Sequence, residues 1–235
     1  MQESRSKSAL VSSLDFSEFS YKGAVCFCLG FSSFLGNLTP SKYTYEDYMS
    51  QLASIDKSDI PELYEEVVHE FNSAVKDCTN PAIVHSDDSF RSQPPNIIGL
   101  FGLVVDVEGG ESFVWENEVL IERLGDKTLA ILCQDFPFVQ NSLKGEEIMQ
   151  IPIIFDGNRM RYRPDRLKLD LLTSKQSRAL NKLARIIKET VPFKLSSIQS
   201  GDVRFMANQQ ALHSRAPYDG YRKLTKTRIF NVEGF

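Results

Sequence analysis

The sequence is poor in histidine and cysteine, has no long apolar run and carries little net charge. Its four cysteines form neither a Cys-x-x-Cys pair nor the framework of a small secreted disulfide protein. Lys and Arg number 27 against 31 Asp and Glu, and this net charge of −4 gives no overall field that would attract nucleic acid or an anionic membrane. No apolar run approaches the roughly 20 residues that span a bilayer, and no apolar signal-peptide core follows the first residues. We therefore expect a soluble cytoplasmic protein with neither nucleic acid nor a membrane as a partner.

Apolar residues are plentiful enough to build a core. They make up 42% of the 235 residues. A chain of this length commonly folds as one β-rich domain, so we expect a single domain spanning 1–235. We expect a polar lead-in over 1–20 and a strand followed by helices over 21–80. The apolar run Gly23–Gly30, bounded by glycines, predicts a buried strand. Thr44–Val75 has helical spacing, with a break near Asp59-Ile60-Pro61.

The segment 82–232 has the pattern of a β core with one helical insertion at about 174–190. The expected elements are strands within 82–116, a helix over Glu116–Leu124, strands over Thr128–Phe138, Ile148–Phe155 and Arg159–Tyr162, an amphipathic helix over Ser174–Thr190 capped by Ser174, and paired strands over Gly201–Phe235 with a turn at Pro217–Gly220. The helices do not alternate regularly with the strands, which favours antiparallel sheets. The predicted fold class is mainly β with flanking helices, built on a double-stranded β-helix (jelly-roll, cupin-like) core.

Two of the three histidines stand in settings typical of a metal site. His85-Ser86-Asp87 places an imidazole and a carboxylate at i and i+2, on the same face of a strand. With His213 from a distant strand they would form a 2-His-1-carboxylate set, which leaves one face of an iron ion open. A His-x-Asp sequence also occurs by chance, so both histidines could instead be ordinary half-buried residues. His69 lies in an acidic helical stretch and is expected on the surface.

Three blocks of sequence, in the same order, are similar to one enzyme family. They are VHSDDSFRSQPPNIIGLFGL, then Glu108-Gly109-Gly110-Glu111-Ser112, then GDVRFMANQQALHSRAPYDG. From about Val84 to Asn231 the chain resembles the clavaminate synthase-like and taurine dioxygenase-like Fe(II)/2-oxoglutarate oxygenases. The blocks match the family's His-x-Asp/Glu, its Gly-Gly-x-Thr, and its Asn followed by Ala-x-His-Gly-Arg. Two departures are Ala207 for the Asp that precedes this Asn and Ser214 for the Gly after the second His.

The resemblance implies roles for particular residues. His85, Asp87 and His213 would hold the metal and serve in catalysis. Because a carboxylate is present, hydroxylation is favoured over halogen transfer. Ser112 would contact the distal carboxylate of 2-oxoglutarate, although it could also be a plain turn residue.

A planar guanidinium matches that carboxylate with two hydrogen bonds, and in the family the Arg that supplies them lies beyond the second His. Arg222, Lys226 and Arg228 share the same parity on the last strand and could face one side. The family's Arg-Trp-Leu-x-Arg pattern favours Arg222, with Lys226 facing the substrate. A shift of two residues would give the role to Arg228, and the sequence leaves that choice open.

The implied activity is that of an iron- and 2-oxoglutarate-dependent dioxygenase using Fe(II), 2-oxoglutarate and O2. The expected reaction is hydroxylation of an unactivated C–H bond in a small molecule, most simply a free or carrier-bound amino acid in natural-product biosynthesis. One alternative is a catabolic dioxygenase of sulfonates or carboxylic acids of the taurine type. Another is a non-catalytic β-sandwich binding protein. A homo-oligomer is compatible with the sequence.

Overall fold

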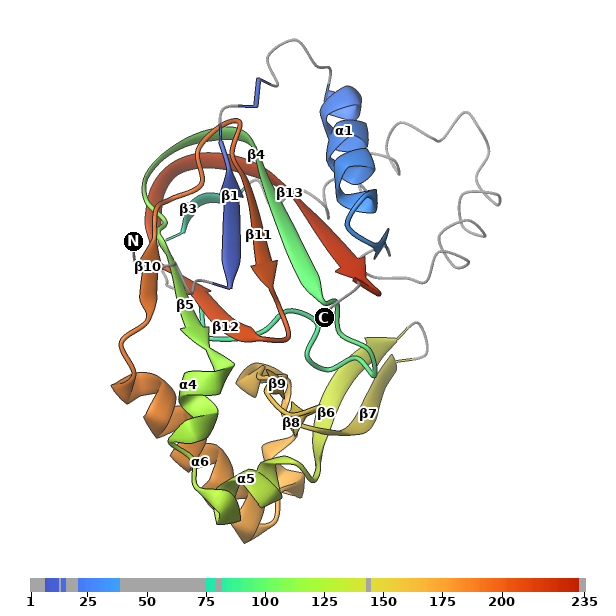
Figure 1. Cartoon of the computed structure of the whole chain (residues 1–235), viewed down its shortest axis with the longest axis vertical. Coiled ribbons are helices and arrows are strands. Elements are labelled where there is room, and N and C mark those ends of the chain that lie inside the picture. The colour runs from blue at the N-terminus through green and yellow to red at the C-terminus, as the bar shows by residue number, and fades with distance from the viewer. Residues whose placement is uncertain are drawn as a thin grey trace.

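Two antiparallel β-sheets face each other in the computed structural model (Figure 1). The structure describes residues 7–12, 14–15, 21–38, 75–78, 82–142 and 145–232. The helices expected over 44–75 lie outside these residues, apart from the end of that range. The elements are β1 (Ser8–Val11), α1 (Tyr21–Ser33), β2 (Asn37–Leu38), β3 (Val75–Cys78), β4 (Ile97–Gly109), β5 (Ser112–Glu116), α4 (Asn117–Glu122), α5 (Asp126–Leu132), β6 (Asp135–Ser142), β7 (Gly145–Pro152), β8 (Ile154–Phe155), β9 (Arg159–Met160), α6 (Ser174–Glu189), β10 (Phe193–Leu195), β11 (Val203–Ala207), β12 (Ala211–Arg215) and β13 (Tyr218–Phe230), with 3-10 turns at Pro164–Arg166 and Leu169–Leu171.

The larger sheet has the order β1-β11-β4-β13-β2, with β3 paired to β13, and the smaller has the order β10-β5-β12. All of these pairings are antiparallel. The long strands β4 and β13 run side by side from the pair Tyr218↔Gly109 to the pair Ile229↔Ile97. This arrangement confirms the predicted mainly β, double-sheet jelly-roll class.

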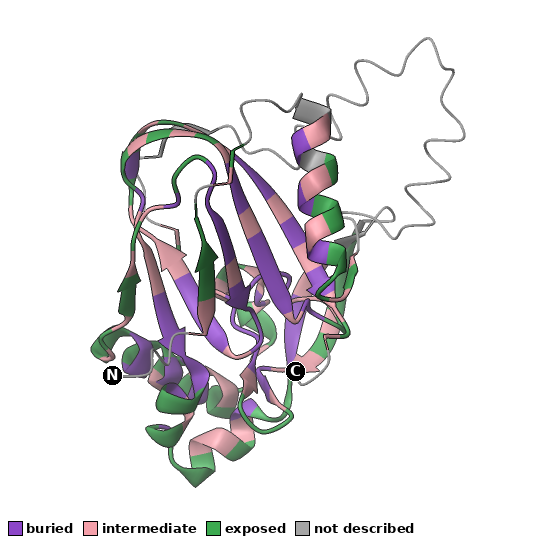
Figure 2. Cartoon of the chain, turned by 45° about the horizontal axis from the view of Figure 1, so that its top comes forward, coloured by how far each residue is buried: buried purple, intermediate pink, exposed green. Residues whose placement is uncertain are grey.

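Strand alternation sends two sets of side chains from β11 to opposite faces of the larger sheet. Val203 and Phe205 belong to a cluster with Phe101 and Cys28. Cys28 lies on α1, and this helix covers the outer face of the larger sheet. Arg204 and Met206 point the other way, toward the smaller sheet. Figure 2 shows mostly buried residues along the central strands and a mixed buried and exposed surface on α1. The space between the sheets is therefore set apart from the cluster under α1.

The prediction of a strand at Gly23–Gly30 is wrong, because this run lies within α1. Ala24, Cys28 and Ser32 are buried at intervals of four, whereas Cys26 and Leu29 are exposed. That is helical periodicity. A short apolar run does not by itself distinguish a buried strand from a helix, and here packing against the outer face of the sheet decided for the helix.

A second core gathers α4, α5, α6 and the hairpin of β6 and β7 below the sheets (Figure 1). Leu120, Leu132, Phe136 and Leu183 are completely buried in it. The expected helix after Glu116 is present as α4, and the amphipathic helix is present as α6. None of the helices in the described residues is both long and apolar enough to cross a membrane.

Three local predictions need correction. Thr128–Leu132 belongs to α5 rather than to a strand, since Asp126 stands in a helical first turn after Gly125. The N-cap of α6 is Thr173, not Ser174, because Thr173 and Gln176 form a reciprocal capping box. Pro217–Gly220 is not a turn: β13 already begins at Tyr218, which pairs with Gly109.

Candidate metal centre

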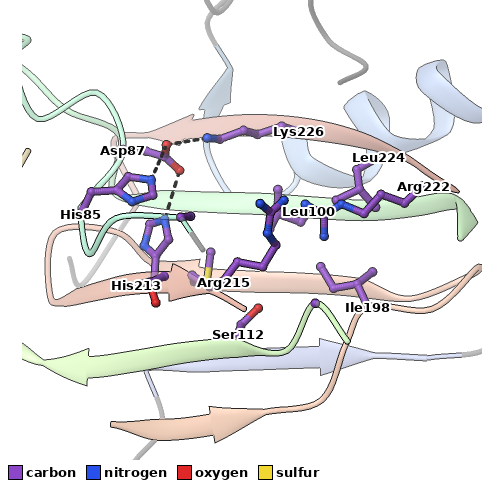
Figure 3. A pocket seen from close by; sticks show the side chains of 14 residues that line it. His85, Asp87, Leu100, Ser112, Ile198, His213, Arg215, Arg222, Leu224 and Lys226 are labelled. Atoms are coloured by element: carbon purple, nitrogen blue, oxygen red, sulfur yellow. Dashed lines mark ion pairs between the residues drawn. The ribbon is translucent and has the colours of Figure 1, made fainter. Parts of the chain in front are cut away.

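The protein brings His85, Asp87 and His213 together at one end of the space between the sheets (Figure 3). His85 lies ahead of β4 and His213 lies in β12, and the two form an isolated antiparallel bridge. The His85 amide donates to the His213 carbonyl at 2.9 Å, and the His213 amide donates back at 2.8 Å. The backbone pairing therefore fixes the two imidazoles side by side, and Asp87 follows on the same face.

The three side chains present their ligand atoms to a common point. Nε2 of His85 lies 3.7 Å from Oδ1 of Asp87, and Nε2 of His213 lies 3.5 Å from Oδ2. The two imidazole rings have centroids 4.5 Å apart. All three ligand atoms lie within 4.8 Å of one another. Two imidazole nitrogens and one carboxylate are the donor set of a facial non-heme iron site.

A backbone carbonyl fixes the tautomer of His85. Its Nδ1 lies 2.7 Å from the Ile83 carbonyl oxygen, which can only accept a hydrogen bond. Nδ1 must therefore carry a proton, and Nε2 is the ring nitrogen that is directed at Asp87 and His213. Metal-binding histidines are commonly oriented by such a contact from the other ring nitrogen.

The ionisation of Asp87 and His213 also suits a metal. Burial alone would raise the pKa of Asp87, but the Lys226 ammonium and the two imidazoles hold it well below its usual range. Lys226 Nζ lies 2.5 Å from Asp87 Oδ1. Burial lowers the pKa of His213, a shift that Asp87 opposes in part, so the neutral imidazole is favoured. A carboxylate and a neutral imidazole are the forms that bind metal ions.

Asn208 clamps the backbone of the loop from Asp87 to Pro95, the candidate metal-ligand loop. Its Oδ1 accepts from the Asp87 amide at 2.7 Å, and its Nδ2 donates to the carbonyls of Asp87 and Pro95, both at 3.0 Å. Asn208 is 1% exposed. One side chain therefore satisfies three buried backbone groups on either side of the turn that carries the carboxylate.

A cavity of about 220 Å³ runs from the triad between the sheets (Figure 3). It is lined by Ser112 from β5, by Arg215 from β12, and by Arg222 and Lys226 from β13. The guanidinium groups of Arg215 and Arg222 lie 4.7 Å and 4.6 Å from the centroid of the Tyr218 ring. Cationic side chains thus dominate the polar lining beyond the carboxylate ligand.

The structure separates the basic residues that the sequence left as alternatives. Arg222 and Lys226 line the cavity. Arg228 Nε donates to Asp88 Oδ2 at 2.7 Å, in the loop that follows Asp87, and Arg228 is not among the cavity-lining residues. Ser112 lines the cavity and accepts a hydrogen bond from Arg204 Nη1 at 3.1 Å.

Sequence reasoning missed Arg204, Arg215 and the clamping role of Asn208. Arg204 is 1% exposed and burial lowers its pKa, although nearby Asp202 opposes the shift. A signal for it was available, since Arg204 alternates with Val203 and Phe205 and so must point to the opposite face of the strand. Arg215 follows His213 by two residues and faces the same side.

The chain is similar in structure to non-heme iron oxygenases. It aligns with the non-heme iron oxygenase OrfP in complex with Fe and alpha-ketoglutaric acid at a TM-score of 0.66 and 13% identity, over 97% of this chain and 76% of OrfP. With asparagine oxygenase in complex with Fe(II), 2S,3S-3-hydroxyasparagine and succinate the TM-score is 0.52 at 19% identity, over 65% of this chain and 50% of that one. The alignment with the structure of OrfP in complex with Fe covers 65% of this chain and 52% of OrfP, so the chain there spans about half the length of OrfP.

At these identities the likeness shows the fold. The chain has the double-stranded β-helix fold shared by OrfP and asparagine oxygenase, which confirms the resemblance noted in the sequence at the level of the fold. No family model matches the sequence, and a search of curated proteins finds no match.

Proposed function

We propose that this protein is an Fe(II)- and 2-oxoglutarate-dependent dioxygenase that hydroxylates a small molecule. The observation that carries the proposal is the convergence of two imidazoles and one buried carboxylate at the end of a cation-lined cavity, in a fold shared with non-heme iron oxygenases. His85, Asp87 and His213 would hold the metal and bear the catalytic role. Bound Fe(II) would supply the activation of O2.

The charges of the cavity support 2-oxoglutarate as the co-substrate. Arg204, Arg215, Arg222 and Lys226 bring positive charge to the space between the sheets, against the single carboxylate of Asp87 among the cavity-lining residues. A dianion complements such an excess of positive charge better than a neutral ligand does.

We assign the distal carboxylate of the co-substrate to Arg222 and Ser112. A guanidinium offers two parallel donors that match a carboxylate, and the Ser112 hydroxyl can add a third. Arg228, the alternative that the sequence left open, is engaged by Asp88. This assignment places the co-substrate between the metal ligands and β13, so the primary substrate must approach from another side of the triad.

The neighbours of this fold support an amino acid as the substrate. OrfP has been seen with (3S)-hydroxy-L-Arg, and asparagine oxygenase with 3-hydroxyasparagine. We propose a free or carrier-bound amino acid or derivative as the substrate here, in a biosynthetic pathway and in the cytoplasm. A taurine-type oxygenase of sulfonates or other acids, and a binding protein without turnover, are separate outcomes of the test below.

The first experiment is anaerobic addition of Fe(II) and 2-oxoglutarate to the purified protein. We expect a weak visible charge-transfer band, and succinate formation once air is admitted. His85→Ala and His213→Ala should abolish the band because each removes a metal ligand. If either variant binds iron as tightly as the parent, the triad assignment is wrong. A parent protein that forms the band but no succinate would indicate binding without turnover.

A second measurement tests the co-substrate assignment. Arg222→Gln should weaken 2-oxoglutarate binding by one to two orders of magnitude, about 1.5–3 kcal/mol for a charge-assisted hydrogen bond. Arg228→Gln is the matched control and should leave that affinity within a few-fold. The opposite ranking would transfer the role to Arg228. Amino acids and sulfonates can then be screened for the gain of one oxygen atom by mass spectrometry, coupled to succinate release.

A further inference from the structure

A second cavity of about 410 Å³ lies outside the metal centre. Its walls come from the loop Ser92–Asn96 before β4, the hairpin of β8 and β9, Arg161 just beyond that hairpin, Gln209 between β11 and β12, and the end of β13 at Phe230 and Asn231. It shares no lining residue with the cavity of the triad. A volume of this size falls within the range of small-molecule sites.

Arg161 places a buried positive charge in this wall. Its side chain is 4% exposed, it donates through Nη1 to the Arg91 carbonyl at 2.9 Å, and its guanidinium lies 4.3 Å from the centroid of the Phe155 ring. Within the part of the chain that the structure describes, Arg161 forms no ion pair with a carboxylate, and its buried Nε has no hydrogen-bond partner. Burial lowers its pKa to about 10, against the opposing effect of Asp156. A buried charge without an ion-pair partner is costly, so an anion in the cavity would stabilise the site.

Gln209 adds an unused acceptor to the same cavity. It is 6% exposed, and its Nε2 donates to the Pro94 carbonyl at 2.6 Å, which fixes the orientation of the amide. Its buried Oε1 then has no hydrogen-bond partner among the described residues. This atom calls for a ligand N–H or O–H group.

The two charged residues at the rim of the cavity, one basic and one acidic, nearly cancel each other's charge. Arg159 Nη1 lies 3.6 Å from Asp156 Oδ2 across the β8–β9 turn, so one cation and one anion face each other there. Arg161 is left as the net positive charge of the lining. The complementary ligand therefore carries about one negative charge together with a hydrogen-bond donor.

We propose that this cavity binds a small carboxylate that also carries a donor, the chemistry shared by α-hydroxy acids and α-amino acids. The carboxylate contacts the Arg161 guanidinium and the donor contacts Gln209 Oε1. The net charge of the lining favours the hydroxy acid, a monoanion, over the zwitterionic amino acid. Because the two cavities share no residue, this site does not depend on the proposed oxygenase activity.

Three probes with the same three-carbon skeleton separate the two contacts. Propionate offers only the carboxylate, L-lactate adds a hydroxyl and L-alanine adds an ammonium. In saturation-transfer NMR titrations of the whole protein we expect L-lactate to bind about fivefold more tightly than propionate, the effect of one net hydrogen bond of about 1 kcal/mol. L-Alanine should bind between the two.

Variants then assign the binding to this cavity. Arg161→Gln should abolish L-lactate binding, and Arg222→Gln, the matched loss of an arginine in the triad cavity, should leave it unchanged. Should Arg161→Gln fail to fold by circular dichroism, Gln209→Met serves in its place and should make L-lactate and propionate equal. The proposal is overturned if the parent protein binds neither probe, if L-lactate and propionate bind equally to it, or if Arg222→Gln rather than a variant of this cavity removes the binding.

Discussion

Replacing Asn208 tests whether its side chain positions the metal-ligand loop. Asn208→Ala removes the three hydrogen bonds to the Asp87 amide and to the Asp87 and Pro95 carbonyls. At about 1 kcal/mol each, the free energy of unfolding should fall by about 3 kcal/mol, and by more if the freed backbone groups stay unsatisfied. With the turn no longer clamped, the carboxylate is less well ordered, and the affinity for a divalent metal should fall 10- to 100-fold.

The assay combines urea denaturation of the metal-free protein with calorimetric titration of Co(II), an air-stable stand-in for Fe(II). Asn117→Ala is the matched control, since Asn117 is also a completely buried amide and donates to two carbonyls, those of Asn158 at 3.2 Å and Gln209 at 2.7 Å. This control should lose about 2 kcal/mol of stability and keep the Co(II) affinity of the parent. Equal weakening of Co(II) binding in both variants would show that global stability, not the clamp, sets metal affinity.

Three further perturbations test other parts of the structure. Lys226→Met should cost about 3 kcal/mol at pH 7, since it strips a buried carboxylate of its cation. The cost should be smaller at pH 3, because a carboxyl with a depressed pKa contributes stability above its unfolded value near 3.9 and loses it as the pH falls through the folded value. Urea titrations that show an equal cost at both pH values would contradict this. Burial raises the pKa of Cys28 to about 12, so iodoacetamide at pH 8 should label exposed Cys26 and spare Cys28 until the protein unfolds, as peptide mass spectrometry can show. Equal labelling in the native protein would mean that α1 does not pack as described. Thr173→Ala should lower the free energy of unfolding by about 1 kcal/mol and Ser174→Ala by less, and the reverse order would return the cap to Ser174.

Sequence patterns gave the wrong secondary structure for short apolar runs, because the segments that pack against such a run are not visible in the sequence. Gly23–Gly30 and Thr128–Leu132 are both apolar enough for a buried strand, and both are helical. Their burial depends on what each packs against, which is the outer face of the larger sheet for α1 and the lower core for α5. The long amphipathic helix α6 was predictable because its periodicity extends over several turns.

Other features could not be predicted from the sequence because they depend on contacts between residues far apart in the chain. The clamp by Asn208 joins residues on opposite sides of the metal-ligand turn to the connection between β11 and β12. The cavity at Arg161 is assembled from four separate parts of the chain. No spacing rule links such residues, since only the pairing of distant strands brings them together.

The sequence by itself determined the fold class and named the three residues that the structure gathers into a candidate metal centre. Strand alternation and the i, i+2 geometry of His85 and Asp87 are local, so the chain encodes them directly. Only the tertiary structure decided which basic residue faces the cavity. Arg222 and Arg228 have the same parity, but their different positions along β13 leave Arg222 in the cavity and Arg228 bonded to Asp88. Parity fixes the face of a strand, whereas the position along it is fixed by packing against the rest of the molecule.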